Sequence, residues 1–101
     1  MQTIQSFLKY IKFEKRGSQH TVVAYEGDLA QFYNFLVSQN QTDWTKVTSK
    51  HIRLWMVNML DGGMLARSVN RKVASVKSFY RFMLREGIVE TPSPVVGDAR
   101  D

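Results

Sequence analysis

Apolar residues recur at helical spacing in four separate stretches of the chain, and no segment shows the alternation that predicts a half-buried strand. The pattern predicts an all-α protein with helices over residues 3–15, 19–38, 49–60 and 66–86. The positions expected to face a common core are Ile4, Phe7, Leu8 and Ile11 in the first helix, Val22, Tyr25, Leu29, Phe32, Tyr33 and Leu36 in the second, Ile52, Trp55, Met56 and Met59 in the third, and Val69, Val73, Val76, Tyr80, Met83 and Leu84 in the fourth.

Residues with strong positional preferences mark the ends of these predicted helices. Gly17 is expected to end the first helix, Ser18 to cap the second and Thr48 to cap the third. The run Asp61-Gly62-Gly63 is a strong stop signal, and Gly87 follows the fourth helix at a position that glycine often occupies in a left-handed conformation. We therefore expect one compact bundle of four helices.

The remaining segments are expected to be irregular. Residues 40–47 are predicted to form a loop, with Trp44 covering the edge of the core. The segment Thr91-Pro92-Ser93-Pro94 has the composition of an extended linker, and the residues up to Asp101 show no periodicity. The sequence thus predicts one domain over residues 1–90, followed by a linker and a disordered tail over residues 91–101.

The fourth predicted helix is amphipathic in a way that suggests a binding face. Opposite its apolar stripe it carries four arginines with two small residues between them: Arg67, Arg71, Arg81, Arg85, Ala74 and Ser78. Small residues let a helix approach a large surface, and arginines beside them can bind phosphates or base edges. A basic face is often merely solvated, but such faces usually mix charges, and Glu86 is the only acidic residue from position 64 to 86.

Composition narrows the choice of partner without deciding it. The net charge of +5 and the sequence pI near 9.8 fit an anionic partner, either nucleic acid or an acidic lipid surface. The chain has no cysteine, which excludes disulfides and thiolate metal sites. Its start does not resemble a signal peptide, and no uncharged run approaches the roughly 20 residues of a membrane span. We expect a soluble cytosolic protein.

The residue pattern indicates no catalytic centre, metal site or cofactor. His20 and His51 lack neighbouring ligands, and no glycine-rich phosphate loop is present. The four tyrosines are assigned to core stripes or a helix flank rather than to nucleophilic catalysis: Tyr10, Tyr25, Tyr33 and Tyr80.

Two motifs resemble a known family. The first comprises Ser18-Gln19-His20-Thr21, Tyr25, Asp28-Leu29 and Phe32, and the second runs from Arg67-Ser68-Val69-Asn70-Arg71 through Ser78-Phe79-Tyr80-Arg81 to Arg85-Glu86-Gly87. Their order and spacing, closed by Pro92-Ser93-Pro94, resemble the N-terminal domain of the tyrosine recombinases, which include phage and transposon integrases and Xer-type resolvases. The resemblance covers about residues 7–94.

This resemblance implies a four-helix, SAM-like core-binding domain that grips duplex DNA opposite a catalytic domain during DNA integration or recombination. The catalytic residues of the family lie in that second domain, so this chain is not expected to be an enzyme by itself. The implied partners are duplex DNA, the protein's own catalytic domain and neighbouring recombinase subunits, and the isolated domain is expected to be a monomer.

In that family the second and fourth helices approach the major groove. Carried onto this chain, the resemblance implicates His20, Thr21, Arg67, Ser68, Asn70, Arg71, Ser75 and Ser78. Glu26 and Gly27 stand where relatives usually have basic residues, so contact by the second helix is expected only at its N-terminus. There free backbone N–H groups and the helix dipole favour phosphate, with Lys15 and Arg16 close in sequence.

Three points stay open from the sequence. Unless the helix lies along the groove, Arg85 is expected to be peripheral, because it lies about 21 Å along the helix from Arg71, whereas the major groove is ~12 Å wide. Phe35 and Phe82 fit either a wide core stripe or a patch for another domain or subunit. The alternative function is a basic helical module that docks an acidic protein partner and touches no DNA.

Overall fold

The computed structural model describes residues 2–89 of the 101-residue chain, and within that range it is all-helical, as predicted. The elements are α1 (Gln2–Phe13), α2 (Gln19–Ser38), a short 3-10 helix η1 (Trp44–Lys46), α3 (Ser49–Asp61) and α4 (Ala66–Arg85). The linker and tail expected over residues 91–101 lie outside the described residues.

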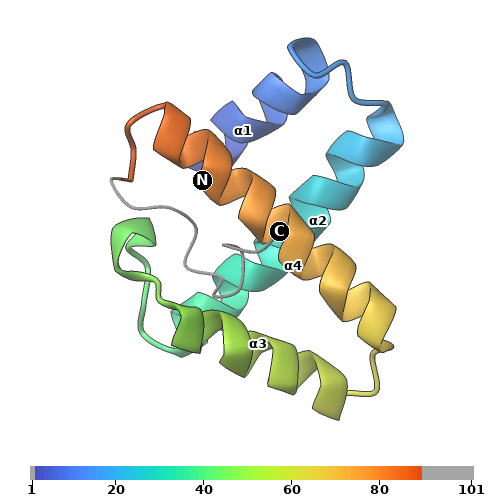
Figure 1. Ribbon diagram of the computed structural model, residues 1–101, viewed down its shortest axis with the longest axis vertical. Coiled ribbons are helices and arrows are strands. Elements are labelled where there is room, and N and C mark those ends of the chain that lie inside the picture. Colours follow the sequence, from blue (N-terminus) through green and yellow to red (C-terminus); the bar gives the residue numbers. More distant parts are fainter. Residues whose placement is uncertain (1, 90–101) are drawn as a thin grey trace, which may run out of the picture.

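The helix α4 crosses α2 and forms the centre of the bundle, with α1 on one side of the crossing and α3 on the other (Figure 1). Because α4 packs against all three other helices, it buries a wider arc than a single stripe. The core clusters along this crossing, where the ring centroids of Phe7 and Phe79 lie 5.4 Å apart and those of Trp44 and Phe79 5.0 Å apart.

The predicted caps at the starts of α2 and α3 are confirmed. The Ser18 hydroxyl accepts a hydrogen bond from the Thr21 backbone N–H at 3.1 Å. At the start of α3, His51 Nδ1 accepts the Thr48 backbone N–H at 3.0 Å, which gives this histidine a local structural role. Each bond satisfies a backbone group that a helix end otherwise leaves open.

The end of α4 is also confirmed. Gly87 has a φ of 76°, its N–H bonds to the Leu84 carbonyl at 3.2 Å, and the Ile88 N–H bonds to the Met83 carbonyl at 2.8 Å. This pair of bonds is a Schellman motif. It turns the chain so that Val89 is buried against the core.

Three positions on α4 differ from the predicted stripe. Phe79 is fully buried although the pattern did not include it, and Phe82 is buried as well, which resolves its ambiguity in favour of the core. Leu84, expected to face inward, is 39% exposed. Phe35 packs partly buried against the same core.

A buried carboxylate joins α2 to α4. Asp28 is 2% exposed and accepts hydrogen bonds from Arg71 Nη1 at 2.7 Å, Lys72 Nζ at 2.9 Å and Ser75 Oγ at 2.7 Å. A carboxylate removed from water is tolerated when such donors surround it. This ion-pair cluster, which we call the Asp28 cluster, fixes how α4 lies across α2.

Replacing Asp28 with Asn should lower the free energy of unfolding by about 2–4 kcal/mol, because the amide accepts fewer bonds and leaves Lys72 and Ser75 poorly paired. Urea unfolding followed by circular dichroism measures the change. Glu26→Gln is the matched control, since it removes the same charge from an exposed site on the same helix. The control should stay within about 0.5 kcal/mol of the parent, and equal losses in both variants would contradict a special role for Asp28.

Two glycines should respond to alanine in opposite directions. A Cβ at Gly17 would lie 2.8 Å from Ile11 Cγ2, whereas a Cβ at Gly27 would meet nothing within 4 Å. Gly17→Ala should therefore destabilise the domain by about 1–3 kcal/mol through overpacking at the corner between α1 and α2. Gly27→Ala should stabilise it by about 0.5–1 kcal/mol, because alanine favours a helix interior.

Thermal unfolding of the two variants beside the parent checks both signs. A rise in melting temperature for Gly17→Ala would show that the corner between α1 and α2 is less tightly packed than the distances indicate.

Candidate nucleic-acid interface

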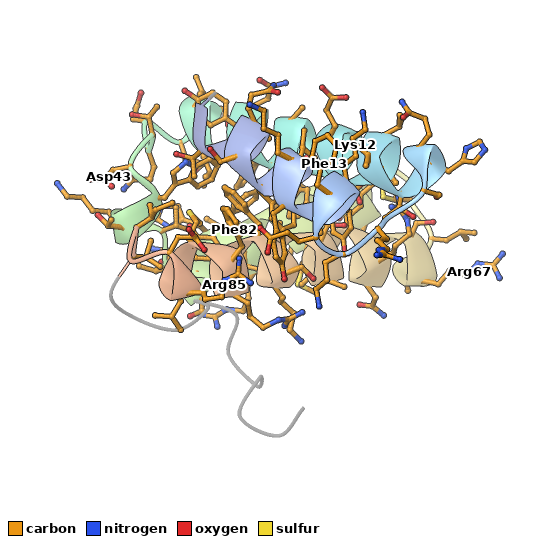
Figure 2. The ribbon with its side chains drawn as sticks, turned by 90° about the horizontal axis from the view of Figure 1, so that it is seen from above. Lys12, Phe13, Asp43, Arg67, Phe82 and Arg85 are labelled. Atoms are coloured by element: carbon orange, nitrogen blue, oxygen red, sulfur yellow. The ribbon has the colours of Figure 1, made fainter. Side chains whose placement is uncertain are left out.

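The outward face of α4 is basic, as the helical pattern predicts. Arg67, Arg71, Arg81 and Arg85 are all exposed, and the exposed Ala74 and half-buried Ser78 lie between them. Arg67 projects from the N-terminal end of α4, while Arg85 lies at the opposite end of the helix (Figure 2). The arginines thus follow the length of one helix rather than meeting at a point.

Arg71 is exposed, as the pattern predicts, but it also bonds to a buried carboxylate. Its Nη1 atom donates to Asp28 at 2.7 Å, while 53% of the side chain remains exposed. The guanidinium has five N–H donors in a planar fork, so one edge can bind the carboxylate while others face solvent. Substituting Arg71 therefore removes an ion pair to a buried carboxylate as well as a surface charge.

Ser75 is the predicted site residue that the structure turns inward. It is 7% exposed and its hydroxyl donates to Asp28. Only the family resemblance named this position; the helical pattern assigned Ser75 neither to the basic face nor to the apolar stripe. We assign Ser75 to the Asp28 cluster, where it completes the set of donors around the carboxylate.

A shallow groove between α2 and α4 brings part of the predicted set together. Its volume is about 250 Å³, and it is lined by Thr21, Ala24, Tyr25, Arg71, Ala74, Ser75 and Ser78. The small side chains of Ala24 and Ala74 keep the floor open, and Arg71 supplies its positive charge. We call this the α2–α4 groove.

The other predicted residues surround the groove without lining it. Arg67, Ser68 and Asn70 lie on the first turn and a half of α4, where Arg67 and Asn70 are exposed and Ser68 is half-buried. His20 is exposed in the first turn of α2, and Arg16 is exposed in the turn that precedes α2, where its φ is 54°.

One of the backbone N–H groups that the sequence leads us to expect free at the N-terminus of α2 is already bonded. The Thr21 N–H already bonds to Ser18, and the Thr21 hydroxyl lies 3.0 Å from the Ser18 hydroxyl. The N–H groups of Gln19 and His20 precede the first intrahelical bond, so they are the donors that the helix end offers an anion.

Sequence reasoning missed Lys72 and Asp28 as determinants of this surface. Lys72 bonds to Asp28 at 2.9 Å, and only 13% of its side chain is exposed. The one signal for Asp28 was its place within the motif that begins at Ser18. A helical wheel treats both residues as solvent-facing, because it cannot show that an aspartate and a lysine from different helices meet.

The described residues offer little for other chemistry. Within residues 2–89, no group of three or more His, Asp or Glu side chains is placed to hold a metal ion. The Tyr80 hydroxyl donates to the Trp44 carbonyl at 3.0 Å, and burial raises the pKa of Tyr80 above its ordinary value, which is the opposite of what a nucleophile needs. None of the described helices is long and apolar enough to cross a membrane.

Residues 4–87 match the family model described as phage integrase, N-terminal SAM-like domain. The chain is 39% identical to tyrosine recombinase XerC of Oceanobacillus iheyensis, covering 86% of this chain and 28% of that protein. It is 35% identical to tyrosine recombinase XerC of Listeria innocua, with 94% and 32% covered, and 33% identical to tyrosine recombinase XerD of Rickettsia bellii, with 85% and 28% covered.

The chain therefore spans less than a third of the length of these relatives. No solved structure matches it significantly. The resemblance to the tyrosine recombinases is confirmed. Because the family match runs from the first turn of α1 to the glycine that terminates α4, the chain belongs to the phage integrase N-terminal SAM-like domain family.

Proposed function

We propose that this chain is the DNA-binding N-terminal domain of a site-specific tyrosine recombinase and that it grips duplex DNA through α4 and the start of α2. The observation that carries the proposal is the α2–α4 groove, where Arg71 and two alanines border an open surface. Its place in a recombinase family supports the same function. Catalysis would then belong to a second domain, with which this domain encloses the duplex in the cytoplasm.

The groove suits a nucleic-acid backbone for a physical reason. A helix whose central positions are small can lie close to a duplex, and cationic side chains on either side then reach phosphates or base edges. Arg71 is held by the Asp28 cluster, so less side-chain entropy is lost when it binds a phosphate. Arg67 and Asn70 extend the surface toward the N-terminal end of α4, and His20, Thr21 and Arg16 extend it across the start of α2.

The domain alone should bind duplex DNA with a dissociation constant on the order of micromolar or weaker at physiological salt, as expected for contact dominated by phosphates. Arg67→Gln and Arg71→Gln should each weaken binding by about fivefold, because each removes a charge-assisted contact. Fluorescence anisotropy with a labelled duplex measures the affinity.

Lys12→Gln is the matched control, because Lys12 is an exposed cation on α1 whose Nζ lies 5.3 Å from the Phe13 ring centroid. All three substitutions remove one positive charge, so a ranking among them tests geometry rather than net charge. Arg67 gives the cleaner result, since Arg71→Gln also disturbs the Asp28 cluster. Equal weakening by all three would reduce the interface to a diffuse positive field, and saturable binding to an acidic protein without DNA binding would favour the alternative function.

A further inference from the structure

A second cavity adjoins the α2–α4 groove and carries a different set of cations. It has a volume of about 480 Å³ and lies between α1, the start of α2 and the C-terminal half of α4. The lining residues that bear on binding are Tyr10, Lys15, Tyr25, Ser78, Arg81 and Arg85. We call this cavity the α1–α4 pocket.

Arg85 is held in place within this pocket. Its guanidinium carbon lies 4.3 Å from the centroid of the Tyr10 ring and 5.7 Å from that of Phe82. Arg85 Nε and Nη2 also contact Glu86 at 3.2 and 3.1 Å. Cation–π contacts of this kind restrain a guanidinium while leaving its outer edge accessible, and half of the Arg85 side chain remains exposed.

Two further cations converge on the same pocket. Arg81 is exposed, and its Nη2 atom donates to the Ser78 hydroxyl at 3.0 Å. Lys15 is exposed beyond the last turn of α1, where its backbone N–H bonds to the Tyr10 carbonyl at 3.1 Å. The pocket therefore presents three cations from two segments that are far apart in the sequence. Such an arrangement suits a phosphate group.

The pocket and the α2–α4 groove are neighbours, because Thr21, Tyr25 and Ser78 line both. We call the pair the trough, with Arg71 lining one part of it and Arg85 the other. Phe82 and Arg85 lie toward one end of this face of the bundle and Arg67 at the other (Figure 2). An extended polyanion bound in the α2–α4 groove would pass close to the α1–α4 pocket.

The length of α4 decides what each part of the trough can reach. Along the helix axis, Arg81 lies about 15 Å and Arg85 about 21 Å from Arg71. The major groove of B-DNA is ~12 Å wide. When α4 crosses the groove rather than lying along it, with Arg71 inside, the α1–α4 pocket lies beyond the groove edge, over the sugar-phosphate strand that borders it.

We propose that the α1–α4 pocket is a phosphate-binding site, formed by Lys15, Arg81 and Arg85, which holds the DNA strand bordering the groove that α4 enters. This inference rests on the proposed DNA binding and adds a second, separate anchor to it. It gives a DNA-contacting role to Arg85, which sequence analysis treats as peripheral, and a defined phosphate site to Lys15, which lies in the turn between α1 and α2.

The test is the salt dependence of duplex binding by the Lys15→Gln/Arg81→Gln double variant, measured by fluorescence anisotropy across a range of salt concentrations. The matched control is Lys50→Gln/Arg53→Gln, which removes two exposed cations from α3, on the other side of the bundle from α1 (Figure 1). Each lost phosphate contact lowers the slope of log K against log salt by roughly 0.9. The pocket variant should lower the slope by about one to two units and weaken binding about tenfold at low salt.

A second pair of variants leaves the charge unchanged. Tyr10→Leu removes the ring that positions Arg85, while Tyr10→Phe keeps it. Binding should weaken about threefold in the leucine variant and stay within about twofold of the parent in the phenylalanine variant, in line with a restrained guanidinium. Thermal unfolding of each variant shows that the comparison is made between folded proteins.

Each result has a separate meaning. If the pocket and control variants change affinity and slope equally, the α1–α4 pocket is not a phosphate site, while weakening by Arg67→Gln would still support the proposed function. If the parent does not bind duplex DNA, both proposals fail. If a poly-glutamate peptide binds the parent but not the pocket variant, and DNA binding is unaffected, the pocket serves an acidic protein partner and the inference is overturned.

Discussion

The structure depends most on one buried carboxylate. Asp28 is 2% exposed at the crossing of α2 and α4, where it accepts bonds from a guanidinium, an ammonium and a hydroxyl, all on α4. The hydrophobic effect is non-directional, whereas hydrogen bonds require a specific geometry. A buried carboxylate that meets three donors on neighbouring turns of α4 therefore disfavours other registers, which would leave it unpaired. Aromatic packing makes the core compact, and the bonds of Asp28 align α4 relative to α2.

The same interaction connects the fold to the proposed function. Arg71 contributes to the Asp28 cluster with one edge of its guanidinium and lines the α2–α4 groove with the rest of the side chain. Its position over the groove is thus fixed by packing between the helices rather than by its own rotamer preference. The cost of this arrangement is that stability and DNA contact share a residue, so mutations at Arg71 cannot separate them. Arg67 and the cations of the α1–α4 pocket lie outside the Asp28 cluster, so substitutions there leave its bonds in place.

The sequence was sufficient for the helices and insufficient for the details of the interface. Apolar periodicity and the capping residues Ser18, Thr48 and Gly87 locate the elements because these signals act within one helix. The single stripe missed Phe79, since α4 packs against three helices and buries a wider arc than a stripe. The same wider arc covers Phe82, for which the pattern left core and interface open. Asp28, Lys72 and Ser75 could not be placed inside from one helical wheel, because their burial depends on their meeting across two helices. The exposure of Arg67, Arg81 and Arg85 followed from the pattern, but the separation of Arg81 and Arg85, in the α1–α4 pocket, from Arg71, in the α2–α4 groove, required the positions of α1 and α2.

The central claim is that the surface spanning α4 and the start of α2 is the face that meets DNA. Amide chemical shifts of the isotopically labelled domain, followed during titration with duplex DNA, test this claim residue by residue. The account predicts shifts concentrated at residues 16–25 and along the outward face of α4, with α3 nearly unchanged. Shifts concentrated on α3, with the first turn of α2 and the arginines of α4 unaffected, would contradict it.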